Sequence, residues 1–224
     1  DGTRAVIVKF SERSSTPAGQ RWADLLQCEH LAGEVLRDHG IAAAESELIR
    51  ADGRVFLQST RFDRTPVLGR PGLVSLAALD AAYYGHGRID WWKFAPQLQR
   101  DGWLAADDAR TLALRGWFGA LIGNSDMHLG NASLILADAR PLALAPSYDM
   151  LPMALRPAST GEIVPRTLDI PAPLPEHHTD WLSAADMAMR FWTRVAASEG
   201  ITATFRDIAA MQLQKLDAAR RRFA

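Results

Sequence analysis

An aspartate and an asparagine five positions apart constrain this chain more than any other feature. Asp126 and Asn131 stand in the segment Gly-Asn-Ser-Asp-Met-His-Leu-Gly-Asn, residues 123–131. The spacing D-x-x-x-x-N suits a tight loop that directs a carboxylate to a hydroxyl group and a carboxamide oxygen to a metal ion. Asp149 follows 18 positions after Asn131 and adds a second carboxylate. The pattern predicts a site for chemistry on phosphate groups.

Each of these residues, taken alone, also has a structural explanation. The cluster at 124–126 is typical of a helix end followed by an Asx turn, and Asp149 of a turn before a proline. Asn131 is a polar residue at the start of an expected strand. The order of the segments favours the functional interpretation, because a lysine, Lys9, precedes them as the phosphate-binding lysine precedes the catalytic loop in kinases.

Lys9 lies near the end of an apolar, β-branched run at residues 5–10, which predicts a strand. A lysine there can reach the phosphates of a nucleotide, although a lone Val-Lys pair is also typical of a strand edge that faces solvent. Glu29 lies on the apolar face of a helix predicted at residues 20–39. A carboxylate on an apolar face needs a partner. We predict that this partner is Lys9, with Glu34 as the second candidate for the lysine.

Taken together, the segments resemble a known family. N-S-D-M-H-L-G-N followed by L-A-P-S-Y-D-M-L is similar to the catalytic core of HipA-type serine/threonine kinase toxins. Residues 61–64, Arg-Phe-Asp-Arg, resemble the hinge of that family, and Cys28-Glu29 resembles its preceding helix. Residues 82–85 and 149–153 resemble the YjjJ-like branch, in which a DNA-binding segment precedes the kinase. The resemblance covers the later, C-terminal part of a HipA-like protein.

The resemblance implies roles in catalysis and metal binding. Asp126 would be the catalytic base for a Ser or Thr hydroxyl. His128 would belong to the same catalytic loop in a scaffolding role, bonded to the loop or to Asp149. Asn131 and Asp149 would bind Mg²⁺, which needs few protein ligands because phosphates and water complete its octahedron.

The resemblance also implies an ATP site. Lys9 would contact the phosphates, held by Glu29. The hinge residues Thr60, Arg61 and Phe62 would contact the adenine, Thr60 through its backbone where HipA-like proteins usually carry Glu, and Phe62 through its ring. We expect the next two residues, Asp63-Arg64, to form a structural ion pair.

These expectations define a fold class: α+β, an incomplete protein-kinase-like fold of two lobes. Residues 1–65 would be the remnant of a small β-rich lobe with the hinge, and residues 66–224 a mostly helical lobe that carries the catalytic loop. The expected elements are helices at 20–39, 73–84, 91–100, 107–122, 181–200 and 202–223, hairpins at 47–59 and 131–145, and a Pro-rich loop at 156–176. We expect the aromatic pairs at 83–84 and 91–92 to pack in the core and between the lobes.

Composition limits the partners and the compartment. The formal net charge of the 224 residues is −1, which gives no electrostatic reason to expect direct nucleic-acid binding by this segment. A single cysteine, Cys28, excludes an internal disulfide framework and fits a cytoplasmic location. The cysteine itself is typical of a buried side chain. No apolar run is long enough for a transmembrane helix, so we expect no membrane partner.

The chain differs from the family in the segment before Lys9, where the family has a phosphate-covering loop. No G-x-G-x-x-G occurs in the sequence, and the family's phosphate-covering loop would lie upstream. Asp1-Gly2-Thr3-Arg4 is typical of a turn between strands, so we expect a fragment of a longer protein whose activity without that loop is open.

Three functions therefore compete. The first is an ATP- and Mg²⁺-dependent protein serine/threonine kinase, a toxin of a toxin–antitoxin or regulatory system, whose family targets include aminoacyl-tRNA synthetases. The second is a kinase-fold binding module, weak or inactive in catalysis, for an antitoxin or a DNA-bound partner. The third, a small-molecule phosphotransferase, shares D-x-x-x-x-N, but Y-D-M-L favours the HipA-like reading.

Overall fold

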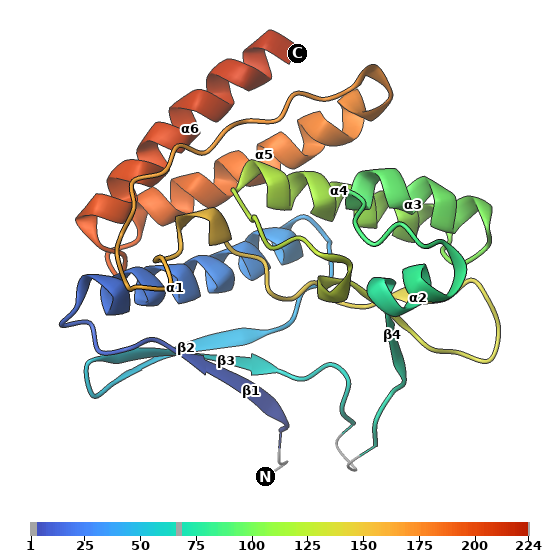
Figure 1. The fold of residues 1–224 in the computed structure, drawn as a ribbon, viewed down its shortest axis with the longest axis horizontal. Helices are drawn as coiled ribbons and strands as arrows, with labels where there is room; N and C mark the ends of the chain where they lie inside the picture. Colours follow the sequence, from blue (N-terminus) through green and yellow to red (C-terminus); the bar gives the residue numbers. More distant parts are fainter. Residues whose placement is uncertain (1–3, 66–68, 224) are drawn as a thin grey trace.

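The computed structural model describes residues 4–65 and 69–223. A small antiparallel sheet lies against one side of a long helix, α1 (Pro17–Asp38), and most of the other helices lie on its opposite side (Figure 1). Most of the turn expected at Asp1–Arg4 falls outside the described residues. The predicted boundary between residues 65 and 66 stays a prediction, since residues 66–68 are not described.

The small sheet has three strands, β1 (Val6–Phe10), β2 (Ser46–Ala51) and β3 (Arg54–Thr60), in the order β1-β3-β2. Asp52 and Gly53 connect β2 to β3, and their φ angles of 49° and 67° are both positive, as a two-residue type I′ turn requires. The predicted strand and hairpin are confirmed. The hairpin could be predicted because its turn chemistry is local.

Helix α1 begins earlier than predicted. The helix was predicted to begin at residue 20, but it begins at Pro17. A proline is tolerated there because the first helical N–H groups have no partner within the helix. Thr16 caps the helix, since its hydroxyl oxygen accepts a hydrogen bond from the backbone N–H of Gly19 at 3.0 Å.

A second small sheet joins distant parts of the chain. Its strands are β4 (Leu73–Ser75), β5 (Ser133–Ile135) and β6 (Ala143–Leu144), in the order β4-β5-β6. The predicted hairpin at 131–145 is confirmed. The helix predicted at 73–84 is wrong at its start, because Leu73–Ser75 pair with β5 and helix α2 spans only Leu76–Tyr83. A short apolar run does not distinguish strand from helix without its partner.

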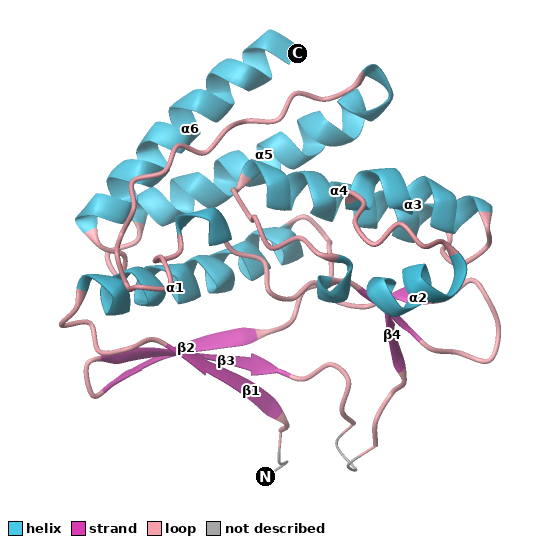
Figure 2. Cartoon of the chain, in the orientation of Figure 1, coloured by secondary structure: helices cyan, strands magenta, loops and turns pink. Residues whose placement is uncertain are grey.

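The remaining helices lie close to their predicted bounds (Figure 2). They are α3 (Trp91–Arg100), α4 (Ala106–Leu121), α5 (His178–Ala197) and α6 (Ala203–Phe223), with short 3₁₀ helices η1 (Leu129–Asn131), η2 (Met153–Leu155) and η3 (Pro175–His177). The segment at 156–176 is irregular up to η3, as predicted. Within the described residues, no helix combines the length and apolar character needed to cross a bilayer.

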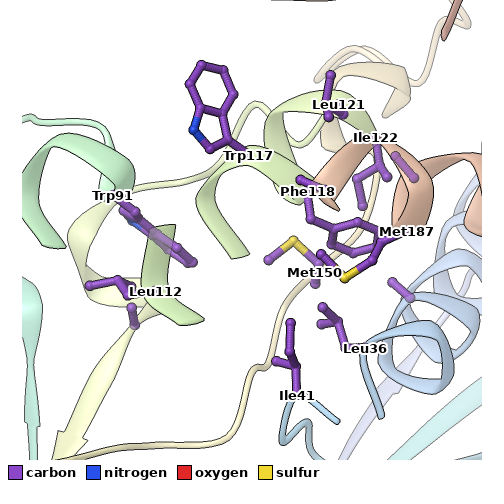
Figure 3. Packing of buried hydrophobic residues seen from close by; sticks show 14 of the residues in the cluster. Leu36, Ile41, Trp91, Leu112, Trp117, Phe118, Leu121, Ile122, Met150 and Met187 are labelled. Atoms are coloured by element: carbon purple, nitrogen blue, oxygen red, sulfur yellow. The ribbon is translucent and has the colours of Figure 1, made fainter. Parts of the chain in front are cut away.

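The main hydrophobic core contains buried residues of all six α-helices. Figure 3 shows Met150 among Phe118 of α4, Met187 of α5 and Leu36 of α1. The residue that follows Asp149 is therefore anchored in the core. Cys28 is fully buried, as predicted.

The aromatic pairs are buried to different extents. Trp91 is buried and Trp92 stacks on Trp117, with ring centroids 4.0 Å apart. Tyr83 does not lie in the core, because this residue is 63% exposed; its ring packs against that of Trp103, with centroids 4.9 Å apart.

Candidate active site

Lys9 of β1 lies at the centre of a charged cluster. Its Nζ atom lies 2.8 and 2.9 Å from the two carboxylate oxygens of Glu29 on α1, and it also contacts the Asp149 carboxylate. The predicted Lys9–Glu29 pair is confirmed. Glu34, the second candidate, instead faces Arg194 of α5 at 3.7 Å. Three elements far apart in the sequence thus meet at one ammonium group.

Burial and charge act in opposite directions on this cluster. Burial by itself lowers the pKa of Lys9, but the negative charges of Glu29 and Asp149 outweigh it, so that this pKa is raised above its ordinary value. Burial raises the pKa of the Glu29 carboxyl, and the charge of Lys9 offsets only part of the effect. The Glu29 side chain is only 10% exposed. Lys9 is therefore held as a cation at neutral pH.

Asp149 has an unusual backbone. Its φ angle is 57°, in the left-handed region that non-glycine residues seldom adopt. Asn124, at the start of the catalytic segment, donates a side-chain hydrogen bond to the Asp149 carbonyl at 3.3 Å. The following residue, Met150, is buried in the core. Such conformations persist where the surroundings hold them, and they concentrate at functional sites.

The segment from Asn124 to Asn131 forms a closed loop. The Asn124 side-chain oxygen accepts a hydrogen bond from the Asp126 backbone N–H at 3.0 Å, and the Asn131 amide donates to the Asp126 carbonyl at 2.9 Å. His128 Nδ1 accepts from the Gly130 N–H at 3.0 Å, which is the bond within the loop that was expected of it. The catalytic roles of Asp126 and His128 stay predictions.

The Asp126 cavity brings the predicted residues together. It has a volume of about 220 Å³, and its charged lining residues are Lys9, Glu29, Asp126 and Asp149. Three carboxylates and one ammonium from separate segments therefore face one space. Asn131 is not among the described residues that line it, so its place as a metal ligand rests on the Asp126–Asn131 spacing.

A second cavity, the hinge cavity, adjoins the first at Lys9, Glu29 and Asp149. Its volume is about 240 Å³, and its walls include the three predicted hinge residues, Thr60, Arg61 and Phe62. The other large side chains that line it are apolar or aromatic: Ile7, Leu36, Leu73, Tyr148 and Met150. A flat, apolar ligand fits such walls, with its charged end at Lys9.

The hinge side chains are fixed by their own contacts. The Arg61 guanidinium binds Asp63, with Nε 2.8 Å from Oδ1, and Arg64 binds the same carboxylate. The predicted Asp63–Arg64 ion pair is confirmed, and Arg61 joins it. Arg61 is thus already paired, while the Phe62 ring lies 5.8 Å from that of Tyr148 at the cavity wall.

Comparison with known proteins identifies the family. The model of the HipA-like C-terminal domain matches residues 1–218. The chain is also 36% identical over 216 residues to "Toxin YjjJ" of Escherichia coli strain K12, which covers 96% of this chain and 48% of that protein. The chain belongs to the HipA-like C-terminal domain family. This HipA-like domain spans about half the length of the curated relative.

Solved structures agree on the fold. The Shewanella oneidensis HipA chain, solved with HipB and operator DNA, superposes with a TM-score of 0.61 at 15% identity, covering 97% of this HipA-like domain and 58% of that chain. The Helicobacter pylori proinflammatory kinase CtkA gives a TM-score of 0.62 at 12% identity, covering 98% and 90%. At these identities the likeness shows the fold, an α+β kinase-like arrangement. A shorter match, 62% identical over 34 residues, is to "Putative kinase Y4dM" of Sinorhizobium fredii.

Two side chains to which the sequence analysis assigned no role hold the segments around Asp126 and Asp149 in the HipA-like domain. Arg115 of α4 is buried and donates to the carbonyls of Ala145 at 2.6 Å and Ala42 at 3.0 Å. Burial lowers its pKa to about 10. The Tyr148 hydroxyl donates to the Gly130 carbonyl at 3.0 Å and so ties the Asp149 segment to the catalytic loop. The role of Arg115 could not be predicted, because a lone arginine on a helix belongs to no motif. Tyr148 lies in the Y-D-M-L motif and could have been singled out.

A missing side chain matters as well. A Cβ atom at Gly119 of α4 would stand 2.0 Å from Met127 Sδ and 3.1 Å from Met150 Sδ. Both methionines are neighbours of the predicted site residues. The glycine therefore lets the catalytic loop and the Asp149 segment pack against the same turn of α4.

Proposed function

We propose that this HipA-like domain is the catalytic part of an ATP- and Mg²⁺-dependent protein serine/threonine kinase that acts as a toxin. The observation that carries the proposal is the single cavity lined by Lys9, Asp126 and Asp149. A kinase needs a cation for the phosphates, a carboxylate for the metal and another for the acceptor hydroxyl. These three side chains supply one of each.

In this proposal the chain's own residues carry the transfer. The oxygen of a Ser or Thr hydroxyl attacks the γ-phosphorus of ATP, and the hydroxyl proton passes to the Asp126 carboxylate. The new O–P bond forms as the bond between the γ-phosphorus and the bridging oxygen breaks, and ADP leaves. Lys9 binds phosphate oxygens, and Glu29 keeps the ammonium in place.

The donor set fits Mg²⁺. This ion prefers oxygen ligands and takes one or two from the protein, the rest from phosphates and water. The Asp149 side chain is 40% exposed and so remains accessible. The amide nitrogen of Asn131 is bound to the Asp126 carbonyl, which leaves its side-chain oxygen as the second ligand. Mg²⁺ bound there would neutralise phosphate charge.

The biological setting is part of the same proposal. The Escherichia coli relative is named a toxin, and the Shewanella HipA is found with HipB and DNA. We propose by analogy an antitoxin or a DNA-binding domain as partner, a cytoplasmic location, and a protein substrate of which aminoacyl-tRNA synthetases are the first candidates.

A second candidate function is a binding module without catalysis. One observation favours it: the Lys9 ammonium contacts Asp149 directly, at the carboxylate assigned to the metal. In this alternative the kinase fold serves only to hold an antitoxin or a DNA-bound partner.

Phosphotransfer from γ-labelled ATP with Mg²⁺ separates the two functions. The natural full-length protein is incubated with purified aminoacyl-tRNA synthetases, beside the Asp126→Asn variant and the control Asp138→Asn, an exposed loop residue. We expect labelled protein in the wild type and the control, and a decrease of about 10²–10⁴-fold in Asp126→Asn. Equal labelling in Asp126→Asn would exclude this residue as the base. ATP binding without labelling of any protein, itself included, would favour the binding module.

A further inference from the structure

A groove lies on the other side of the catalytic loop. One wall is the loop between α2 and α3 with the start of α3, and the other is the segment at 124–129, which comes down from α4 toward α2 (Figure 1). Small residues of α4, Gly116 and Ala120, form its floor. We call it the Arg88 groove, after the cation that lines it. Its volume is about 460 Å³, within the range of about 300–1,000 Å³ typical of ligand sites.

Asp126 joins this groove to the charged cluster. Among the described residues, it is the only one that lines both the Arg88 groove and the Asp126 cavity. Its carboxylate therefore stands where the two spaces meet. A base that takes a proton from a hydroxyl must reach the acceptor from one side and the phosphate from the other. The Arg88 groove is the space left for the acceptor.

The groove offers a free cation. Within residues 4–65 and 69–223, no hydrogen bond or ion pair engages the Arg88 guanidinium, which is exposed. Of the other polar side chains that line the groove, Asp90 is paired with Lys93 at 2.8 Å, and His128 Nδ1 accepts from the Gly130 N–H at 3.0 Å. Arg88 is thus the positive group available to a bound anion.

The loop that carries Arg88 is held in a fixed shape. The Asp80 carboxylate of α2 is buried and accepts hydrogen bonds from the backbone N–H of His86 at 3.1 Å and of Gly87 at 2.8 Å. Gly87 has a φ angle of 68°, which this turn requires. A buried carboxylate that binds two consecutive backbone groups orders the loop before any ligand arrives.

We propose that the Arg88 groove binds the acceptor segment of a protein substrate, with its Ser or Thr hydroxyl at Asp126 and an acidic side chain at Arg88. The proposal rests on the proposed kinase function and adds the class of substrate. The groove extends from Asp126 along the start of α3, so that a peptide segment can lie in it. A peptide can also supply an anionic side chain for the Arg88 guanidinium, separate from the hydroxyl group at Asp126. The transfer is the one described above: the hydroxyl oxygen gains the γ-phosphoryl group, Asp126 gains the proton and ADP leaves.

The test uses two fluorescein-labelled peptides with one central serine, flanked by glutamates in the first and by lysines in the second. Binding to the natural full-length protein is followed by fluorescence anisotropy, without nucleotide. We expect the acidic peptide to bind more tightly, and Arg88→Ala to weaken its binding roughly tenfold, the loss of one hydrogen bond to a charged group. Arg88→Glu should reverse the preference in favour of the lysine peptide. The control is Arg100→Ala at the far end of α3, whose side chain is 70% exposed.

A kinetic measurement separates this inference from the function on which it rests. With ATP and Mg²⁺, Arg88→Ala should raise KM for the acidic peptide and leave kcat unchanged, because Arg88 holds the substrate and not the reacting atoms. If the KM for the acidic peptide is the same in Arg88→Ala as in the wild type, the inference about the groove is wrong, whereas the kinase function stands. If the acidic peptide binds in an Arg88-dependent way but no phosphotransfer occurs, the proposed kinase function is wrong, whereas the groove still binds the peptide. Equal affinities for both peptides in all variants, without phosphotransfer, would overturn both.

Discussion

The side-chain amide of Asn131 donates a hydrogen bond to the backbone carbonyl of Asp126 at 2.9 Å. The first and last residues of D-x-x-x-x-N are thereby tied together, and the loop between them is closed. The bond uses the amide nitrogen and leaves the amide oxygen for another partner. One side chain thus has two roles in this proposal, shaping the loop and binding a metal.

Two substitutions of Asn131 separate these roles. Asn131→Ala should lower the free energy of unfolding by about 1 kcal/mol, since it removes a hydrogen bond. It should also raise several-fold the Mg²⁺ concentration needed for ATP to stabilise the protein. Asn131→Asp, which keeps an oxygen ligand but cannot donate, should lose only the stability. Thermal melts over a Mg²⁺ series measure both effects, and an unchanged Mg²⁺ requirement in Asn131→Ala would remove this residue from the metal site.

Asp149 should be required for Mg²⁺-dependent nucleotide binding. A ligand raises the melting temperature only of a protein that binds it, by the equivalent of about 2.7 kcal/mol at a hundred times Kd. We expect this rise with ATP and Mg²⁺ to disappear in Asp149→Asn. Asparagine is the better test than alanine, because it tolerates the positive φ of this position. Asp149→Ala should lose the same binding and melt lower without ligand, and a full ATP shift in Asp149→Asn would contradict the assignment.

The Lys9–Glu29 pair should show strong coupling in stability. Lys9→Met leaves the nearly buried Glu29 carboxylate without its hydrogen-bond donor, which should cost about 1–3 kcal/mol of unfolding free energy. Adding Glu29→Gln removes the unpaired charge and should recover part of this loss. Chemical denaturation of the two single variants and the double variant measures the coupling. Strictly additive losses would show that the two side chains do not stabilise each other.

The ion pair of Asp63 in the hinge should make the free energy of unfolding depend on pH. Its hydrogen bond with Arg61 lowers the pKa of this carboxyl from 3.8 to about 2. Since the folded pKa is depressed, the stabilisation is present above pH 3.8 and is lost as the pH falls toward 2. Asp63→Asn should therefore be less stable than wild type at pH 7, by about 1 kcal/mol after solvent screening. The difference should shrink between pH 3.8 and 2 in urea denaturation, and a constant difference would argue against the ion pair as its cause.

Local chemistry explains the parts that the sequence predicted well. The Asp52-Gly53 turn, the Asp126–Asn131 spacing and the helix at 91–100 each depend on residues that are close in the chain. The Lys9–Glu29 pair was also predictable, because an apolar helix face leaves a carboxylate few partners. These features need only the propensities of short segments.

Long-range contacts explain what the sequence left open. Leu73–Ser75 form a strand only because β5 lies beside them, nearly sixty residues later in the chain. Arg115 is buried only because the carbonyls of Ala42 and Ala145 meet it there. Neither partner can be inferred from the pattern around the residue itself.

The sequence by itself determined the identity and order of the chemical groups: a lysine on a strand, a carboxylate on the next helix, a D-x-x-x-x-N loop and a following aspartate. Only the tertiary structure decided that Lys9, Asp126 and Asp149 line one cavity, and that Asp126 also borders a groove with the free cation of Arg88. The reason is physical. A motif fixes the distances between neighbours in the chain, whereas a cavity is the space that remains after distant elements have packed against a common core.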